Sequence, residues 1–257
     1  MAAYAATVFG DIASANIVGY ANGERTIPAD GYYIGNMTFA GVGDEGMIAV
    51  KDILTTTAVP GDYDTMDSAA PQIQVLDANG STYTRYYYTS DAYDADGNEV
   101  TGWADKNDDI AVDTYPTGTG FWYWSRGSES TITFPGQVDD SASVTKDTNV
   151  GYSLLGNPYP TGIKLTSISC TGLIPGDYDT MDSAAPQIQL LDANGSTYTR
   201  YYYTSDAYDA DGNEVTGWAD KNDDIVYDAV APVTAGFWLW NRGTTNGKIT
   251  ISSPIQK

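Results

Sequence analysis

The hydrophobic and aromatic residues of this chain fall into short runs that suit β-strands, and turn residues separate the runs. Asn79-Gly80 and Asp96-Gly97 supply the positive φ angles that tight hairpin turns require. The only helical candidate is a short turn within 47–54. Strands are predicted at 73–77, 82–88, 98–103, 120–124 and 131–134. Short antiparallel strands with turns between them predict an all-β fold of the sandwich or barrel type.

The whole pattern occurs twice, at an offset of 115 residues. Residues 59–110 return as 174–225, and only two of these 52 positions differ, where Val59 becomes Ile174 and Val75 becomes Leu190. Outside this block Gly35-Asn36 answers Gly156-Asn157, and 48–54 answers 163–169. The second set of strands is predicted at 188–192, 197–203, 236–240 and 248–251. The sequence therefore predicts two tandem antiparallel β-sandwich or barrel domains from an internal duplication, with boundaries at 1–14 (extension), 15–137 and 138–257.

The segment before the first repeat is expected to serve as an edge strand. Residues 14–20 contain Ile17, Val18 and Tyr20, which give a strand something apolar to bury. A sheet edge is an open row of backbone donors and acceptors that must be covered or used. In repeat two the linker 138–150 is expected to supply the corresponding strand. We expect the N-terminal strand to complete a sheet edge, and another subunit's edge is the predicted acceptor.

Charge and composition exclude several classes of function. The chain has 34 acidic residues against 12 lysines and arginines, which gives a net charge of −22. This charge disfavours nucleic acid and anionic membrane surfaces as partners. The chain contains no histidine and one cysteine, Cys170, so it has no Ser-His-Asp triad, no Cys-His pair and no intramolecular disulfide. Because two identical active sites in one short chain would be unusual, we expect no enzyme.

The acidic turns are candidate calcium sites. Asp94, Asp96 and Asn98 surround a glycine turn and resemble the start of a calcium-binding loop, and Asp209, Asp211 and Asn213 repeat them. The glutamate that ends an EF-hand loop is absent. The plain alternative is a solvated Asp-Gly turn. Asp105, Asp108 and Asp109 could complete such a site.

Aromatic runs on the predicted strands could form binding surfaces. In Tyr86-Tyr87-Tyr88, and in the twin run Tyr201, Tyr202 and Tyr203, the middle residue faces opposite to its neighbours. Displayed tyrosines could bind glycans or anchor a protein interface, and ordinary strand packing is the alternative. Trp122 and Trp124 share one face and are expected in the core, as are Trp238 and Trp240.

One motif pair resembles a known class of repeat. GYSLLGNPYP at 151–160, followed by GFWLWNRG at 236–243, is similar to a repeat unit of secreted and surface-anchored proteins of Gram-negative bacteria. The resemblance implies a β-rich module outside the cell or at its surface and names no activity. No apolar run approaches the length of a membrane span. The sequence leads to two hypotheses: a self-assembling structural protein of a filament or surface layer, joined by its N-terminal strand and supported by Ca²⁺, and a carbohydrate-binding or adhesive module.

Overall fold

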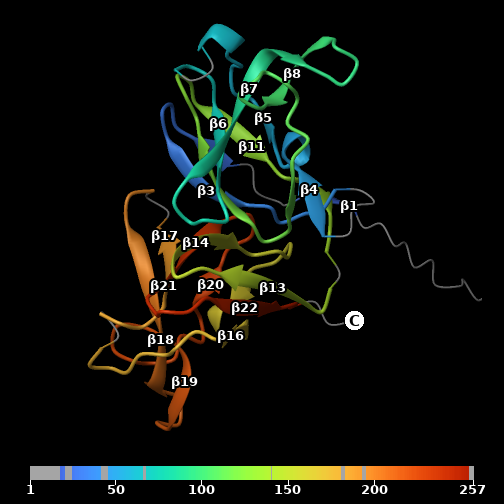
Figure 1. Ribbon diagram of the computed structural model, residues 1–257. Coiled ribbons are helices and arrows are strands. Elements are labelled where there is room, and N and C mark those ends of the chain that lie inside the picture. The colour runs from blue at the N-terminus through green and yellow to red at the C-terminus, as the bar shows by residue number, and fades with distance from the viewer. Residues whose placement is uncertain are drawn as a thin grey trace, which may run out of the picture.

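The protein forms two β-sheet lobes in a computed structural model that describes residues 18–20, 25–41, 46–65, 68–139, 141–180, 183–192 and 195–254. The lobe drawn in blue and green belongs to repeat one, and the lobe drawn in yellow to red belongs to repeat two (Figure 1). Strands and three short 3₁₀ turns make up all the regular structure of the described residues. The predicted all-β fold is confirmed. None of these elements is a helix long and apolar enough to cross a membrane.

Each repeat contains a five-stranded antiparallel sheet, and both sheets have the same strand order. Repeat one uses β3 (Tyr32–Asn36), β10 (Gly120–Trp124), β6 (Gln72–Leu76), β7 (Tyr83–Tyr93) and β8 (Glu99–Ala104) in that order. Repeat two uses β14 (Gly151–Gly156), β21 (Gly236–Asn241), β17 (Gln187–Leu191), β18 (Tyr198–Tyr208) and β19 (Glu214–Ala219). The sequence predicted β6, β7, β8, β10, β17, β18 and β21 to within a residue or two, except that β7 and β18 each continue five residues farther. It predicted no range for β3, β14 or β19.

Smaller sheets form the second layer of each repeat. Repeat one has β2 (Arg25–Ile27), β11 (Ser130–Thr133) and β5 (Thr55–Thr56), and repeat two has β13 (Ser143–Thr148), β22 (Gly247–Ser252) and β16 (Ile168–Thr171). Two further pairs are β4 (Met47–Ala49) with β9 (Thr114–Pro116), and β15 (Ile163–Lys164) with β20 (Val230–Ala231). The 3₁₀ turns are η1 (Val50–Asp52), η2 (Tyr63–Thr65) and η3 (Leu165–Ser167). The helical turn expected in 47–54 is therefore a strand followed by η1.

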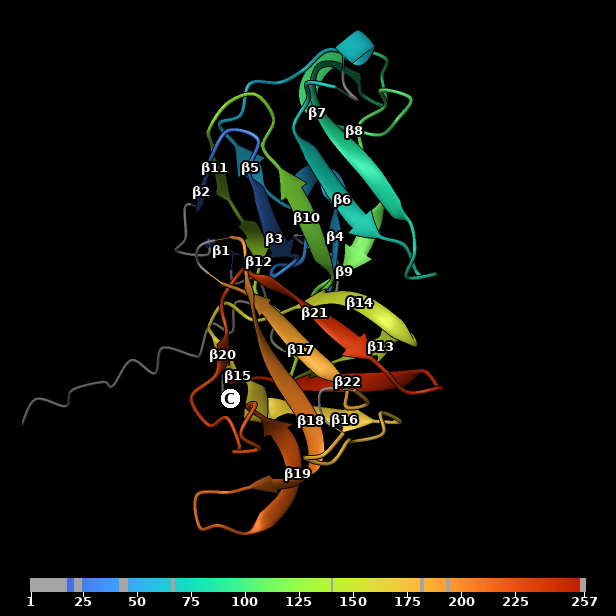
Figure 2. The same cartoon turned by 90° about the vertical axis from the view of Figure 1, so that its left-hand side faces the viewer.

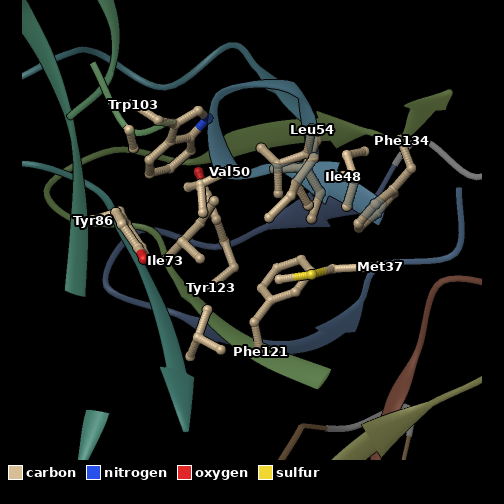
Figure 3. Close-up of a cluster of buried hydrophobic side chains, with 14 of the residues drawn as sticks. Met37, Ile48, Val50, Leu54, Ile73, Tyr86, Trp103, Phe121, Tyr123 and Phe134 are labelled. Atoms are coloured by element: carbon tan, nitrogen blue, oxygen red, sulfur yellow. The ribbon is translucent and has the colours of Figure 1, made fainter. Parts of the chain in front are cut away.

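The core of each repeat lies between its two layers. In repeat one Ile73, Phe121 and Tyr123 of the large sheet are fully buried and belong to one cluster with Ile132 of the small sheet. Figure 3 shows the large-sheet side chains converging on Met37, Val50 and Leu54. Repeat two has a separate cluster built in the same way around Phe237 and Leu239. Full burial of one such side chain contributes about 1.5–3 kcal/mol.

The tryptophans of β10 and β21 lie on the face of the large sheet opposite to the core, so their predicted place in the core is wrong. Phe121 and Tyr123 are the buried pair of β10, whereas Trp122 and Trp124 are half-buried on the other face. The same holds for Trp238 and Trp240 in β21. Alternation along a strand fixes which residues share a face. It could not fix which face turns inward, because both faces of this segment carry aromatic residues.

The two repeats join through contacts that a local two-fold axis would generate. Gly35 pairs with Ala235, and Thr119 pairs with Leu155. The Asn36 backbone N–H donates to the Thr234 carbonyl at 2.9 Å, as that of Gly156 does to the Gly118 carbonyl at 2.9 Å. Asn36 lies opposite Gly120 in β10 as Gly156 lies opposite Gly236 in β21. Asn36 is therefore the counterpart of Gly156, one residue away from the alignment that the sequence favoured.

An aromatic strip crosses this junction on the outer face of both large sheets. We define it as Tyr32, Trp122, Trp124, Arg126 and their counterparts Tyr152, Trp238, Trp240 and Arg242. Trp122 and Trp238 meet across the junction with ring centroids 6.4 Å apart. The rings of Tyr32 and Trp124 stack with their centroids 4.9 Å apart. The Arg126 guanidinium carbon lies over the same Trp124, 3.7 Å from its ring centroid. Repeat two reproduces both stacks at 5.0 and 3.6 Å.

The N-terminal segment does form a strand, and it pairs within its own chain. β1 (Val18–Tyr20) runs antiparallel to β12 (Pro135–Gln137), and β2 continues along β11. Residues 18–20 and 25–27 thus accompany 130–137 as the edge of repeat one (Figure 2). In repeat two β13, from the linker, accompanies β22 in the same way, as predicted. Ile17 lies outside the described residues, as does the rest of 14–17.

A buried lysine lies beside the junction between the repeats. Lys146 of β13 is 8% exposed, and a side chain on Gly118 of repeat one would meet its Cε atom. Burial lowers the pKa of Lys146 to about 8, and the charge of Asp139 opposes this shift. The charged form is thus destabilised in the folded protein. The resulting cost to stability is present below pH 8 and is relieved as pH rises from 8 toward the unfolded pKa of 10.5.

We expect Lys146→Met to stabilise the protein at pH 7, by up to about 3 kcal/mol if the shift is fully expressed. The advantage over the wild type should shrink between pH 8 and pH 10, because the wild-type lysine then loses its charge. Urea unfolding of both proteins at pH 7, 8, 9 and 10 measures the difference. A difference that is independent of pH would contradict the assignment.

Candidate functional site

The middle tyrosines of the two runs are buried rather than displayed. Tyr87 is 4% exposed and packs against Ala70, and Tyr202 is 5% exposed and packs against Ala185. The loop before β6 covers Tyr87, because the Gly61 N–H donates to the Tyr88 carbonyl at 3.0 Å. The twin loop does the same through Gly176. Tyr87 and Tyr202 are therefore not available as an open platform for sugar rings.

The flanking tyrosines face the core. Tyr86 is fully buried, and Tyr88 and Tyr203 are half-buried against Trp103 and Trp218 at ring-centroid distances of 5.3 Å. The Tyr86 hydroxyl donates to Asp113 Oδ2 at 2.8 Å and lies 2.7 Å from the Tyr115 hydroxyl. Burial raises the pKa of Tyr86, and the bonds to Tyr115 and Asp113 raise it further.

Tyr201 has the same sequence context as Tyr86 but different surroundings. The Leu165 N–H bonds to Ala229 as the Val50 N–H bonds to Asp113, and Ile163 pairs with Ala231 as Ile48 pairs with Tyr115. Ala229 and Ala231 therefore take the places of Asp113 and Tyr115. Tyr201 is half-buried, and its hydroxyl has no hydrogen-bond partner among the described residues.

A cleft lies beside Tyr201 in repeat two, and Ala229 lines it, whereas Ala231 is fully buried in the core. The cleft has a volume of about 770 Å³ and lies between β18 and the segment 220–229. β18 pairs with β19 only from Tyr202 onward, so Tyr198–Tyr201 form a free strand edge along the cleft. Its charged side chains are two carboxylates and two cations, and its rings are tyrosines. The lining side chains that matter here are Tyr201, Tyr227, Arg200, Lys221, Asp220 and Asp228.

The predicted calcium residues form tight turns that use their own carboxylates. Asp94 Oδ1 accepts hydrogen bonds from the Asp96 N–H at 2.9 Å and from the Asn98 N–H at 2.8 Å. The Asn98 side chain donates to Asp94 Oδ2 at 3.2 Å. These bonds, chiefly from Asn98, hold the pKa of Asp94 below its usual value. Asp209, Asp211 and Asn213 repeat the arrangement with the same partners.

The plain-turn alternative therefore accounts for the contacts at these six residues. Among the described residues no group of three or more His, Cys, Asp or Glu side chains is arranged to hold a metal ion. Asp105 also caps its own turn, accepting from the Asn107 N–H at 2.7 Å. Asp108 differs, because its side chain is buried rather than turned to solvent. Binding of Ca²⁺ remains a prediction that these contacts do not test.

Cys170, in β16, is half-buried and packs against the core of repeat two. Burial raises the pKa of its thiol to about 12, which keeps the thiol protonated at neutral pH. A nucleophilic cysteine needs the opposite shift. Thr55 aligns with Cys170 in the sequence, but in the structure Thr56 pairs with the buried Ile132 as Cys170 pairs with the buried Ile249, so Thr56 is the counterpart.

Sequence reasoning missed the residues that make the repeats unequal. Asp113, Tyr115, Ala229 and Ala231 lie just beyond the near-identical block, where repeat two also carries one extra residue. Comparing the segments 111–115 and 226–231 could have flagged the difference. The burial of Tyr86 and the cleft at Tyr201 required the strand register.

Comparisons of the chain with protein-family models, with curated proteins and with solved structures found no match.

We expect Asp94→Ala to lower the melting temperature, because the variant removes the acceptor for two backbone N–H groups of the turn. Asp96→Ala is the matched control, since the structure gives its carboxylate no hydrogen bond. Thermal unfolding with EDTA and with Ca²⁺ separates the two interpretations of the turn. The loss in Asp94→Ala should be equal in both conditions, and a loss seen only with Ca²⁺ would instead support a calcium site there.

Proposed function

We propose that this protein is a non-enzymatic structural subunit that assembles outside the cell by exchange of its edge strand. The observation that carries the proposal is the pairing of residues 18–20 and 25–27 with 130–137. β1 is tied by three residue pairs to β12 and precedes everything else in repeat one. The same segment of a second copy presents identical residues to the same edge. Exchange of an identical element between copies is a low-cost route to assembly.

Other features of the molecule support a structural role. The repeats are joined by backbone hydrogen bonds at 2.9 Å and by the aromatic strip, which favours a stiff unit. The charge of −22 suits a soluble subunit with many counter-ions. The location outside the cell rests on the resemblance of 151–160 and 236–243 to repeats of secreted proteins.

We expect a disulfide between positions 18 and 137 to block assembly. Val18 and Gln137 are directly opposed across the antiparallel pair, and such pairs have Cα separations of about 4.5–5.5 Å, within the range of disulfides. In Val18→Cys/Gln137→Cys the oxidised monomer holds its strand in its own chain. It should stay monomeric in light scattering and electron microscopy, and reduction should restore polymers.

Wild-type protein with and without reductant controls for effects at Cys170. Deleting residues 1–20 should likewise leave folded repeats that do not polymerise. Polymers formed by the oxidised, intramolecularly closed variant would contradict strand exchange and would place the interface on the repeated faces. Wild-type protein that stays monomeric at high concentration would contradict assembly altogether.

The cleft of repeat two favours saccharide binding as a second function. In repeat one the phenol ring of Tyr115, with its hydroxyl group, and a carboxylate oxygen of Asp113 occupy the space beside Tyr86. In repeat two this space is open, and Tyr201 keeps its hydroxyl. The charges lining the cleft balance, so a neutral ligand is favoured. A pyranose offers a ring, hydroxyl groups and no charge.

We expect the cleft to bind neutral saccharides and Ala229→Tyr to abolish the binding, because a ring on this lining residue would occupy the space beside Tyr201. A panel of di- to tetrasaccharides built from glucose, galactose, mannose and N-acetylhexosamines can be titrated by NMR. Tyr201→Phe should weaken binding several-fold, and Tyr86→Phe is the matched control in repeat one. Binding that survives both cleft variants, or no binding to any member of the panel, would contradict this function.

A further inference from the structure

A pair of buried or half-buried carboxylates lies behind a bulge in the longest strand of each repeat. The pairing of β7 with β8 shifts register between Thr89 and Ala92, and that of β18 with β19 shifts between Thr204 and Ala207. Asp91 and Asp206 lie in these bulges. Their partners Asp108 and Asp223 are 3% and 1% exposed. The duplication thus presents the same arrangement twice.

Asp108 and Asp223 are held in place by a backbone conformation that favours their burial. Their φ angles are 68° and 67°, which belong to the left-handed region that aspartate tolerates better than most residues. The Tyr93 N–H donates to the Asp108 carbonyl at 2.8 Å, and the Tyr208 N–H does the same to Asp223. These bonds fix the segment against the bulged strand.

Neighbouring groups donate hydrogen bonds to only some of the oxygens of these carboxylates. Thr89 Oγ1 donates to Asp108 Oδ1 at 3.2 Å, and Thr204 Oγ1 donates to Asp223 Oδ1 at 2.9 Å. The Tyr63 N–H reaches Asp91 Oδ2 at 3.2 Å, and the Tyr178 N–H reaches Asp206 Oδ2 at 3.3 Å. Three buried oxygens have no hydrogen-bond partner in the described residues: Asp91 Oδ1, Asp206 Oδ1 and Asp223 Oδ2.

Within the described part of the chain, these carboxylates form no ion pair with a lysine or arginine. The ion pairs Lys51–Asp52 and Lys248–Asp147 lie elsewhere. Burial raises the pKa of Asp108, and the charge of Asp91 adds to the shift; burial and the charge of Asp206 act on Asp223 in the same way. A buried carboxylate without a partner is costly, and proteins relieve the cost with a proton or with a metal ion.

We infer that each repeat binds a Ca²⁺ ion at this pair of carboxylates, Asp91 with Asp108 and Asp206 with Asp223. The donors are carboxylate oxygens beside a threonine hydroxyl, which is the chemistry of a hard cation and not that of zinc or copper. Two carboxylates and one hydroxyl supply fewer than the six to eight oxygens that Ca²⁺ takes, so water completes the shell. So few protein ligands are typical of weak sites, with dissociation constants of about 10⁻⁴–10⁻³ M.

This site differs from the acidic turn at Asp94. The Asp94 oxygens already accept hydrogen bonds from Asp96 and Asn98, whereas the oxygens at Asp91 and Asp223 have unused acceptor capacity. The inference is independent of strand exchange, because both pairs lie within single repeats and can be measured on monomeric protein. Its rival is a proton shared between the two carboxylates.

Terbium luminescence tests the inference on the full-length chain, since Tb³⁺ replaces Ca²⁺ and is excited through nearby tyrosines such as Tyr93. We expect about two Tb³⁺ ions per chain, displaced by Ca²⁺, and a melting temperature raised by Ca²⁺. Asp223→Asn should remove one ion. Asp108→Asn/Asp223→Asn should weaken Ca²⁺ binding at least tenfold and abolish the thermal shift. Asp94→Asn/Asp209→Asn is the matched control and should bind like the wild type.

Asp108→Asn/Asp223→Asn is also expected to be more stable than the wild type in EDTA, because neutral amides replace unpaired charges. This gain shows that the variant is folded. If Ca²⁺ gives the wild type no thermal shift and Tb³⁺ no saturable luminescence, the carboxylates share a proton and the inference is wrong. It is equally wrong if the control variant loses binding while the Asp108 and Asp223 variant retains it.

Discussion

The close backbone approach between the repeats is the constraint on which the rest of this structure depends. A side chain on Gly156 would collide with Asn36, and one on Gly236 would collide with the Gly35 carbonyl and Ile34. Only glycine lets the strand ends meet closely enough for the paired backbone bonds of the junction. The aromatic strip follows from this contact, because the junction brings Trp122 next to Trp238. The two cores remain separate beneath it.

Much of the fold was accessible from the sequence, for identifiable reasons. Alternation and the Asn-Gly and Asp-Gly turns located the large-sheet strands, since hairpin turns fix strand ends strongly. The extension of β7 to Tyr93 was missed because a bulge interrupts the alternation there. The inward face of β10 was assigned wrongly because both faces carry aromatic residues. The junction was unpredictable, since no local pattern encodes a contact between residues about 200 positions apart.

The candidate sites illustrate a second limit of sequence reasoning. Tyr86 and Tyr201 share identical neighbours along the chain, yet one is sealed by Asp113 and Tyr115 while the other borders a cleft. Burial is decided by residues far along the chain, so local identity does not guarantee an identical environment. Conversely, Asp94 looked like a ligand because its spacing is right, but the turn itself consumes its oxygens. The sequence offered Asp108 only as a residue that could complete that site, together with Asp105 and Asp109, and its burial is what distinguishes it from them.

The local two-fold relation between the repeats limits how a larger array of copies of this chain could acquire a direction. A self-complementary contact that is made within one chain is closed, so no further copy can add to it. Beyond the junction, the outer ends of the molecule are near-copies that point opposite ways. Any polarity of a larger array must therefore come from the places where the repeats differ. The edge strands are one such difference, because repeat one is edged by the three-residue strands β1 and β2, and repeat two by the six-residue β13.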